Sequence, residues 1–380
     1  MSQKEITHLK IGVLGGGQLG RMMVQSAINY NLDISVIDPD PNAPCAHLVE
    51  NFSVGKLTDE ETIYQWGKEF DLLTIEIENV SVNALKRLHS EGIQVFPQPQ
   101  VIELIQDKRK QKTFYKANRI PTSDFVLTEN KEDVATYSDM LPAVNKLGTE
   151  GYDGRGVQMI RTAKDLDKAF DKPGLLENLV DFEKELSVVV ARNESGEKKC
   201  FPVVELSYHP EHNLVEFLFA PAQIEKAIEE KAYDLAESVI EKLGMIGLLA
   251  VEMFLTKDGD LLVNEVAPRT HNSGHHTIEA NITSQFEQHL RAIMNMPLGS
   301  SDLITPAAMV NLLGEDGFTG DALYQGLSDC MAMKGVYVHL YGKKITKPFR
   351  KMGHVTIADS DIDTLKNKAR KVKDTLKITA

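Results

Sequence analysis

The chain has 380 residues, of which 42% are hydrophobic and 26% are charged, and its formal net charge is −13. This length is too great for one ordinary core and predicts two or three domains in a globular protein. The acidic balance disfavours binding to nucleic acid, and three widely spaced cysteines without a long apolar segment are typical of a cytoplasmic protein that contacts no membrane.

The first hundred residues alternate strand and helix patterns. Buried strands are expected at 9–14, 34–37 and 72–77, and an amphipathic helix is expected to run through about Tyr30. Such alternation predicts a parallel sheet with helices on both faces. We place this domain at about residues 1–100.

A glycine motif separates the first strand from the first helix. Gly15, Gly17 and Gly20 have the G-x-G-x-x-G spacing, and Asp38 ends the next strand. This context is typical of a dinucleotide site, where backbone approaches a phosphate at a helix N-terminus. There are two alternatives to a dinucleotide site: the loop faces the phosphate of another ligand, or its glycines serve only tight packing. The stiff Asp-Pro-Asp-Pro stretch that begins at Asp38 would crowd a ribose, and a second nucleotide site later in the chain also disfavours NAD(P).

A charged helix at 107–118 leads into a region with another pattern. Expected strands at 143–146 and 157–160 enclose a glycine-rich loop at 149–156, which favours a flap, although a simple hairpin turn is the alternative. Lys146 lies in the first strand, where a lysine under such a cover suits nucleotide phosphates; the alternative is a snorkelling edge residue. Lys108 is a second candidate, for which a solvated helix face is the plainer interpretation.

The pair Asp258-Gly259 predicts a hairpin within residues 247–266, after an amphipathic helix at 224–243. If these two residues form the turn, Glu252 and Glu265 lie directly opposite each other, with Cβ atoms about 4.5–5.5 Å apart. Two such carboxylates repel unless a cation lies between them, and oxygen ligands suit Mg²⁺. A one-residue register slip is the alternative. Strand alternation points Asn264 to the other face.

The last third of the chain contains histidine and basic motifs. His271 and His275 have a spacing that invites zinc, but the intervening Ser-Gly disfavours a helix, so polar contacts to a substrate are the better interpretation. Arg350 and Lys351 precede Met-Gly-His354 at an expected strand, where an anion site competes with a solvated edge. Short strands at 309–313, 335–341 and 354–357 predict a small β-rich domain at 301–380.

Five segments together resemble the 5-(carboxyamino)imidazole ribonucleotide synthase family of bacterial purine synthesis. They are GGGQLGRM from Gly15, EIENV from Glu76, GYDGRG from Gly151, NEVAPRTHNSGH from Asn264 and RKMGH from Arg350. The resemblance covers nearly the whole chain, with the segments in the family's order. It implies an α/β (α+β) ATP-grasp fold with an N-terminal Rossmann-like domain, an ATP-grasp domain at 101–300 with a flap subdomain at about 117–185, and the β-rich C-terminal domain.

The resemblance also implies a reaction. Bicarbonate attacks the γ-phosphate of ATP, and the resulting carboxyphosphate carboxylates the amine of 5-aminoimidazole ribonucleotide, with Mg²⁺ or Mn²⁺ as cofactor. The family is commonly homodimeric. Rival interpretations are another ATP-grasp ligase such as the formate-dependent glycinamide ribonucleotide transformylase, an NAD(P) dehydrogenase, and a catalytically silent nucleotide sensor, which the intact carboxylate pair disfavours.

Site residues follow from the resemblance position by position. Catalytic roles fall on Tyr152, Arg155 and Lys351, and the metal on Glu252 and Glu265. The ATP site takes Lys108, Lys146, Gly151, Tyr152, Asp153, Gly154, Arg155, Gly156, Val157, Glu177, Asn178, Leu179, Val180, Glu185, His209, Asn264 and Glu265. The ribonucleotide site takes Gln18, Glu78, Asn79, Arg269, His271, Asn272, Arg350 and Lys351. Three positions depart from the family: Glu150 and Val157 replace glycine and glutamine beside the flap, and His209, or else His212, stands near the family's ATP-proximal histidine.

Overall fold

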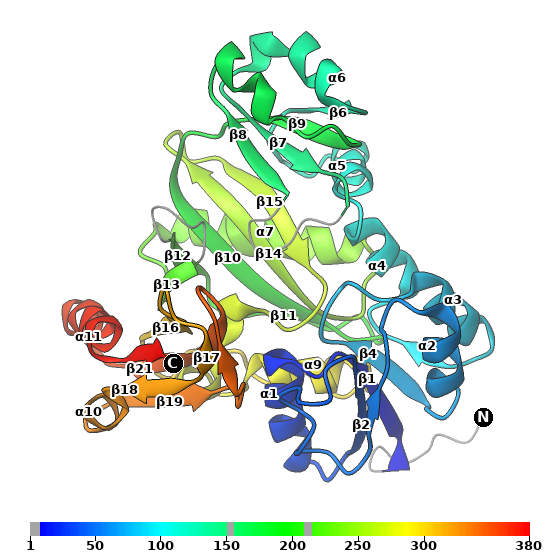
Figure 1. Cartoon of the computed structure of the whole chain (residues 1–380), viewed down its shortest axis with the longest axis vertical. Helices are drawn as coiled ribbons and strands as arrows, with labels where there is room; N and C mark the ends of the chain where they lie inside the picture. Colours follow the sequence, from blue (N-terminus) through cyan, green and yellow to red (C-terminus); the bar gives the residue numbers. More distant parts are fainter. Residues whose placement is uncertain (1–7, 150–155, 209–214) are drawn as a thin grey trace.

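The computed structural model describes residues 8–149, 156–208 and 215–380. Figure 1 shows three regions: the N-terminal domain at the lower right, a small sheet at the top, and a large sheet between them that continues into the C-terminal strands at the lower left. The site lies on the large sheet, and elements of the other regions reach it.

The N-terminal domain is a parallel sheet with strand order β3-β2-β1-β4-β5, as predicted. Alternate residues of its strands enter different cores: Ile11 and Val13 pack with α1, whereas Leu14 and Ile75 pack with α3. The elements are β1 (Lys10–Leu14), α1 (Gln18–Ile28), β2 (Asp33–Asp38), β3 (Phe52–Val54), α2 (Glu60–Gly67), β4 (Leu72–Ile75), α3 (Val82–Ser90), β5 (Gln94–Val95) and α4 (Pro99–Ile105).

The upper region is an antiparallel sheet with order β6-β9-β7-β8, entered from helix α5. Lys146 on β7 lies opposite Val157 on β8, so the two strands predicted around the glycine-rich loop are confirmed as neighbours. The elements are α5 (Lys108–Ala117), β6 (Phe125–Thr128), α6 (Lys131–Thr136), β7 (Ala143–Leu147), β8 (Val157–Ile160) and β9 (Gly174–Asn178), with short 3₁₀ segments at Ser138–Met140 and Ala163–Lys168.

The large sheet has order β15-β14-β10-β12-β13-β16-β21-β19, and β11 pairs with β10. The C-terminal strands form near their predicted positions, but they continue this sheet through the β13–β16 pairing and make no separate large sheet. The strands are β10 (Phe182–Arg192), β11 (Lys198–Cys200), β12 (Val204–Tyr208), β13 (Val215–Ala220), β14 (Gly247–Thr256), β15 (Leu261–Ala267), β16 (Ala307–Leu313), β19 (Val336–Leu340) and β21 (Lys351–Ala358).

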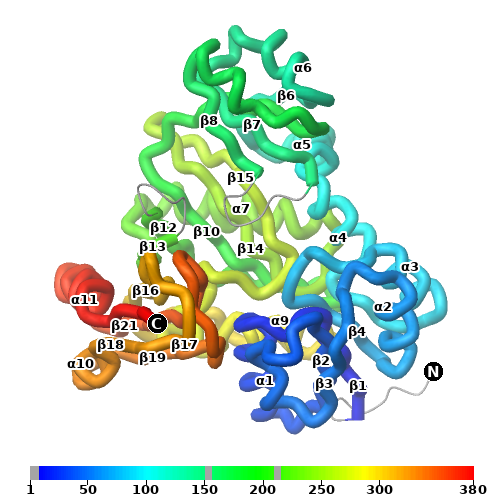
Figure 2. The backbone as a smooth tube through the Cα atoms, in the orientation of Figure 1, coloured from blue at the N-terminus to red at the C-terminus, as the bar shows by residue number. Residues whose placement is uncertain are grey.

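Helices and short strands complete this part of the chain. Helix α7 lies against β10, and α9 packs on β10 and β14 (Figure 2). The remaining elements are α7 (Lys226–Lys242), a 3₁₀ turn (Asn272–Gly274), α8 (Thr277–Ala280), α9 (Gln285–Ile293), β17 (Gly320–Asp321), β18 (Leu323–Gln325), α10 (Leu327–Met331), β20 (Ile345–Thr346), α11 (Ile362–Thr375) and β22 (Lys377–Thr379).

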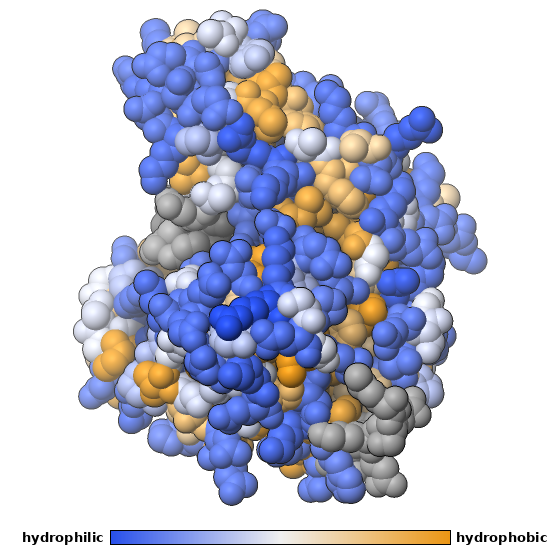
Figure 3. Space-filling view, turned by 90° about the vertical axis from the view of Figure 1, so that its right-hand side faces the viewer, coloured by the Kyte–Doolittle hydropathy of each residue, from blue (hydrophilic) through white to orange (hydrophobic). Residues whose placement is uncertain are grey.

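One face of the large sheet packs against the apolar core, and the opposite face carries ionisable side chains. Leu186, Val188 and Val251 belong to the buried cluster that includes α7. Because successive side chains of a strand alternate, Glu185 and Glu252 point to the opposite face. Among the residues that the structure describes, no helix has the length and apolar composition to cross a bilayer. The face of the molecule in Figure 3 is largely hydrophilic, with apolar areas between the polar ones.

Candidate active site

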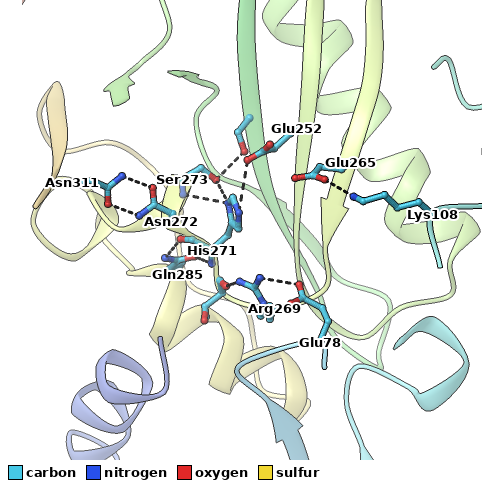
Figure 4. Close-up of polar contacts among 12 residues, drawn as sticks. Glu78, Lys108, Glu252, Glu265, Arg269, His271, Asn272, Ser273, Gln285 and Asn311 are labelled. Atoms are coloured by element: carbon cyan, nitrogen blue, oxygen red, sulfur yellow. Dashed lines mark hydrogen bonds and ion pairs between the residues drawn. The ribbon is translucent and has the colours of Figure 1, made fainter. Parts of the chain in front are cut away.

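The centre of the site is a pair of glutamates on neighbouring strands. Glu252 on β14 lies directly opposite Glu265 on β15, as predicted, and the two side chains lie near each other in Figure 4. The predicted two-residue turn is wrong, however. Leu255 pairs with Leu261, and the amide of Thr256 donates to the carbonyl of Asp260, so the turn has three residues and ends at Gly259 with φ +83°.

A β-bulge restores the predicted pairing. The longer turn shifts the register by one residue, so Met253 faces Val263, and the extra residue Asn264 returns Glu265 to the position opposite Glu252. The bulge also redirects Asn264, whose Oδ1 accepts a hydrogen bond from Lys146 Nζ at 3.2 Å. The expectation that Asn264 points away from the site is therefore wrong, because a bulge interrupts the alternation on which it relied.

Two lysines lie beside this pair, and a third contacts Glu177 behind them. Lys108 Nζ lies 2.9 Å from Glu265 Oε2, and its side chain is 20% exposed, so the interpretation of a solvated helix face is wrong. Lys146 Nζ lies 3.2 Å from Glu177 Oε2. Sequence reasoning missed Lys112, which lies 3.3 Å from Glu177 Oε1. Its four-residue spacing from Lys108 on one helix was the available signal, because such residues share a face.

The glutamate pair carries an electrostatic conflict. Burial, reinforced by the charge of Glu265, raises the pKa of Glu252 to about 8, whereas Lys108 lowers the pKa of Glu265 to about 2. Burial and the neighbouring carboxylate thus both favour the neutral form of Glu252. A divalent cation between the two carboxylates would favour ionisation of both, and an all-oxygen donor set suits Mg²⁺ or Mn²⁺. The residues present thus fit the metal that the sequence predicted.

Two further groups lie on the same face of the sheet. The Tyr208 hydroxyl donates a hydrogen bond to Glu185, and burial raises the pKa of Glu185 to about 7. Tyr208 was not among the predicted site residues, although it directly precedes His209. His209 and the flap residues Gly151, Tyr152, Asp153, Gly154 and Arg155 lie outside the described residues.

The nucleotide residues predicted near the end of β9 differ in exposure. Glu177 is buried, whereas Asn178 and Leu179 are exposed and Val180 is partly exposed. The Glu177 carboxylate accepts a hydrogen bond from Ser123 Oγ at 3.0 Å and contacts two lysines. Its side chain is therefore held by the protein.

The first glycine loop is filled by the protein itself. Glu76 Oε1 accepts the backbone N–H of Leu19 at 3.1 Å, and Asp38 accepts that of Gly16 at 2.7 Å. A Cβ at Gly17 would lie only 2.4 Å from Glu76 Oε1. The Glu76 carboxylate thus lies at the N-terminus of α1, where a dinucleotide would place its pyrophosphate. The NAD(P) interpretation is therefore disfavoured by geometry as well as by sequence.

Of the residues predicted to face the ribonucleotide, Glu78, Arg269, His271 and Asn272 lie near the glutamate pair (Figure 4). Arg269 Nη2 lies 2.9 Å from Glu78 Oε1. His271 Nε2 lies 3.7 Å from Glu252 Oε1, and its Nδ1 lies 2.9 Å from Ser273 Oγ. Asn272 exchanges two hydrogen bonds with Asn311, each 2.9 Å long.

The other predicted substrate residues have more varied surroundings. Gln18 is partly exposed at the start of α1, and Asn79 is exposed. Arg350 Nη1 donates to the carbonyl of Ile345 at 2.6 Å. Lys351 begins β21, and its charge counteracts the rise in the pKa of Glu252. The C-terminal basic motif therefore reaches the glutamate pair electrostatically.

The second and third histidines of the HNSGHH segment are buried away from solvent. His275 and His276 are each 1% exposed, and the His275 ring lies 4.6 Å from that of His354. In the part of the chain that the structure describes, no three His, Cys, Asp or Glu side chains are arranged to hold a metal ion.

Three family models match the chain in the order of its regions. They describe a ribonucleotide synthetase preATP-grasp domain at residues 8–106, an ATP-grasp domain at 113–286, and a phosphoribosylaminoimidazole carboxylase C-terminal domain at 307–368. The chain is 39% identical to N5-carboxyaminoimidazole ribonucleotide synthase of Bacillus subtilis, over 91% of this chain and 90% of that protein. It is 38% identical to chloroplastic phosphoribosylaminoimidazole carboxylase of Vigna aconitifolia, over 94% of this chain but 65% of that longer protein.

Solved structures agree over nearly the whole chain. N5-carboxyaminoimidazole ribonucleotide synthetase from Thermotoga maritima matches with a TM-score of 0.91 and 44% identity, covering 98% of this chain and 99% of that one. The Aspergillus clavatus synthase in complex with ADP and 5-aminoimidazole ribonucleotide matches with a TM-score of 0.89 and 30% identity, covering 97% and 99%. The chain belongs to the N5-carboxyaminoimidazole ribonucleotide synthase family, whose members are ATP-grasp ligases.

Proposed function

We propose that this protein carboxylates the amine of 5-aminoimidazole ribonucleotide with ATP and bicarbonate, giving N5-carboxyaminoimidazole ribonucleotide, ADP and phosphate in purine biosynthesis. The observation that carries the proposal is the opposed pair Glu252–Glu265 with Lys108 and Lys146 nearby, in a chain similar over its length to synthases of this name. The solved structure of the Aspergillus clavatus synthase contains both ADP and 5-aminoimidazole ribonucleotide.

The nucleotide lies over the face of the large sheet that carries Glu185 and Glu252. Lys108 and Lys146 offer positive charge to its phosphates, and Glu185 with Tyr208 offers polar groups farther along the same face. Glu252 and Glu265 hold Mg²⁺ or Mn²⁺, which supplies a Lewis acid for the transferred phosphate. The ATP-binding residues also include the segment from Gly151 to Val157, together with Asn178, Leu179, Val180 and His209.

The reaction has two steps. A bicarbonate oxygen attacks the γ-phosphorus, the bond to the β-phosphate oxygen breaks, and ADP leaves carboxyphosphate behind. The amine then attacks the carboxyl carbon, releases phosphate and loses a proton. Lys351, with Tyr152 and Arg155, neutralises the anionic intermediate, which must also be shielded from water.

The ribonucleotide binds between the glycine loop and the metal pair. Glu78, Arg269 and His271 form the described centre of this surface, because Arg269 contacts Glu78 and His271 lies beside Glu252. Gln18, Asn79, Asn272 and Arg350 complete it. We further propose that the enzyme is a cytoplasmic homodimer, as its family resemblance implies; light scattering with the purified protein checks the oligomeric state.

The substrate is tested by ATP hydrolysis in three mixtures. ADP release with Mg²⁺ and bicarbonate is expected to rise on addition of 5-aminoimidazole ribonucleotide. Formate with glycinamide ribonucleotide serves as the matched comparison and is expected to leave the rate unchanged. Stimulation by formate with glycinamide ribonucleotide, and not by 5-aminoimidazole ribonucleotide, would overturn the proposal in favour of the transformylase.

A further inference from the structure

A lysine without an assigned role lies beneath the nucleotide site. The Lys112 side chain is 2% exposed, which is rare for a lysine. Its Nζ contacts Thr122 Oγ1, Ser123 Oγ at 3.1 Å and Glu177 Oε1 at 3.3 Å. Burial of the Lys112 ammonium group without a charge partner would be costly. Glu177 and the two hydroxyls stabilise it at this position.

Glu177 is shared between two lysines. Its Oε1 faces Lys112, and its Oε2 faces Lys146 at 3.2 Å. Lys146 is the more exposed of the two lysines, at 12%, and its Nζ also reaches Asn264 Oδ1 beside the glutamate pair. One carboxylate between two ammonium groups leaves the cluster with an excess positive charge on the side of Lys146.

We propose that Lys112 is a positioning residue for ATP: it neutralises Glu177 and thereby leaves the charge of Lys146 available to the nucleotide phosphates. The inference rests on the proposed function only in that the chain binds ATP. If Lys112 were neutral, Glu177 would be balanced by Lys146 alone, and the pair would present little net charge to an anion. Because the site is partly desolvated, that difference acts with little screening.

The same cluster is joined to the strand that carries the metal ligand Glu265. Thr122 Oγ1, which contacts Lys112, donates to the carbonyl of Val263 at 2.7 Å. The amide of Val263 in turn donates to the carbonyl of Pro121 at 2.8 Å. The loop that Lys112 contacts is therefore hydrogen-bonded to β15 directly before the bulge.

The charge of Lys112 is expected to disappear within an accessible pH range. Burial lowers its pKa to about 8; Glu177 opposes this fall, whereas Lys146 and Lys108 add to it. The protonated form is present below pH 8 and is lost as the pH rises through that value. The affinity for ATP is thus expected to fall on the alkaline side, and this loss is expected to be absent when residue 112 carries no charge.

The test measures ATP dissociation constants by calorimetry, with Mg²⁺ and without ribonucleotide. Lys112→Met is expected to weaken binding about tenfold or more, whereas the matched control Lys110→Met, at a half-exposed position of the same helix, is expected to bind as the wild type does. The double variant Lys112→Met/Glu177→Gln removes both charges and is expected to recover most of the lost affinity, because Lys146 is again unbalanced.

The outcomes separate charge from structure. A merely structural lysine predicts that the double variant binds no better than Lys112→Met, and this result would overturn the inference, as would unchanged affinity in Lys112→Met. If Lys112→Met does not fold, two measurements still test the inference. They are the ATP affinity of the double variant and the fall of the wild-type ATP affinity above pH 8. A wild-type protein that binds no ATP would instead overturn the proposed function, and a wild type that binds ATP without responding to the ribonucleotide would affect only the proposed substrate.

Discussion

Two regions of this molecule bring carboxylates close to groups of the kind that bind phosphate, with opposite results. At the first glycine loop, Glu76 accepts the N–H of Leu19 at the start of α1, so the protein satisfies the helix N-terminus itself. On the large sheet, Glu252 and Glu265 oppose each other, and Lys146 of the adjoining small sheet belongs to a cluster with excess positive charge. A ligand thus finds uncompensated charge only in the second region.

The difference shows why a phosphate motif alone is a weak guide. The glycine spacing at Gly15–Gly20 describes only the backbone, whereas Glu76, which fills the loop, directly follows β4, more than fifty residues later. Conversely, no glycine motif surrounds Lys112 or Lys108, yet both lie within reach of the site. The charge balance around a loop decides whether it binds an anion.

The largest expected effect is at the glutamate pair. Glu265→Gln keeps the shape of the side chain but removes one charge from the proposed metal site, so turnover is expected to fall roughly a thousandfold, or about 4 kcal/mol. Steady-state ADP release measures the loss, and thermal unfolding checks that the fold is intact. Glu183→Gln, at an exposed position on β10, is the control. Retention of a tenth or more of the wild-type rate would contradict the assigned role.

A smaller effect is expected at the filled loop. Burial raises the pKa of Glu76 to about 7 from its usual value of 4.5. The unfolded chain therefore loses this proton at lower pH than the folded protein does, and stability falls between pH 4.5 and 7 by roughly 3 kcal/mol. Glu76→Gln retains an oxygen acceptor for Leu19 and is expected to remove this dependence.

The measurement is the free energy of unfolding at pH 4 and pH 8. Relative to wild type, Glu76→Gln is expected to gain stability between the two values, whereas Glu69→Gln, an exposed glutamate of the same domain, is expected to follow the wild type. An identical pH dependence in wild type and Glu76→Gln would show that the Glu76 carboxylate does not titrate in this interval.

The smallest effect is expected from a dinucleotide. NAD⁺ or NADP⁺ is expected to leave the melting temperature unchanged, because Glu76 fills the position of a pyrophosphate. ATP with Mg²⁺ at a hundred times its dissociation constant is expected to stabilise the same protein by about 2.7 kcal/mol. Saturable stabilisation by the dinucleotide would remove the contrast between the two regions.

The sequence alone determined what depends on local periodicity. Strand and helix alternation predicted the parallel N-terminal sheet, and Asp258-Gly259 predicted a hairpin. Glu252 does lie opposite Glu265, but through a three-residue turn and a bulge that the sequence did not predict. These features rest on short-range rules, since side chains alternate along a strand and turn residues constrain the backbone nearby. Resemblance added the family, whose motifs are contiguous in sequence.

Only the tertiary structure decided which charges meet. The bulge at Asn264 corrected a wrong turn length and turned that side chain towards Lys146, and local propensity does not specify such an insertion. Glu76 meets Leu19 across 57 residues, and Lys112 meets Glu177 across 65, through contacts between different elements. Pairings of this kind depend on how sheets and helices pack. Desolvation destabilises a buried charge, and packing must bring a partner to it to compensate.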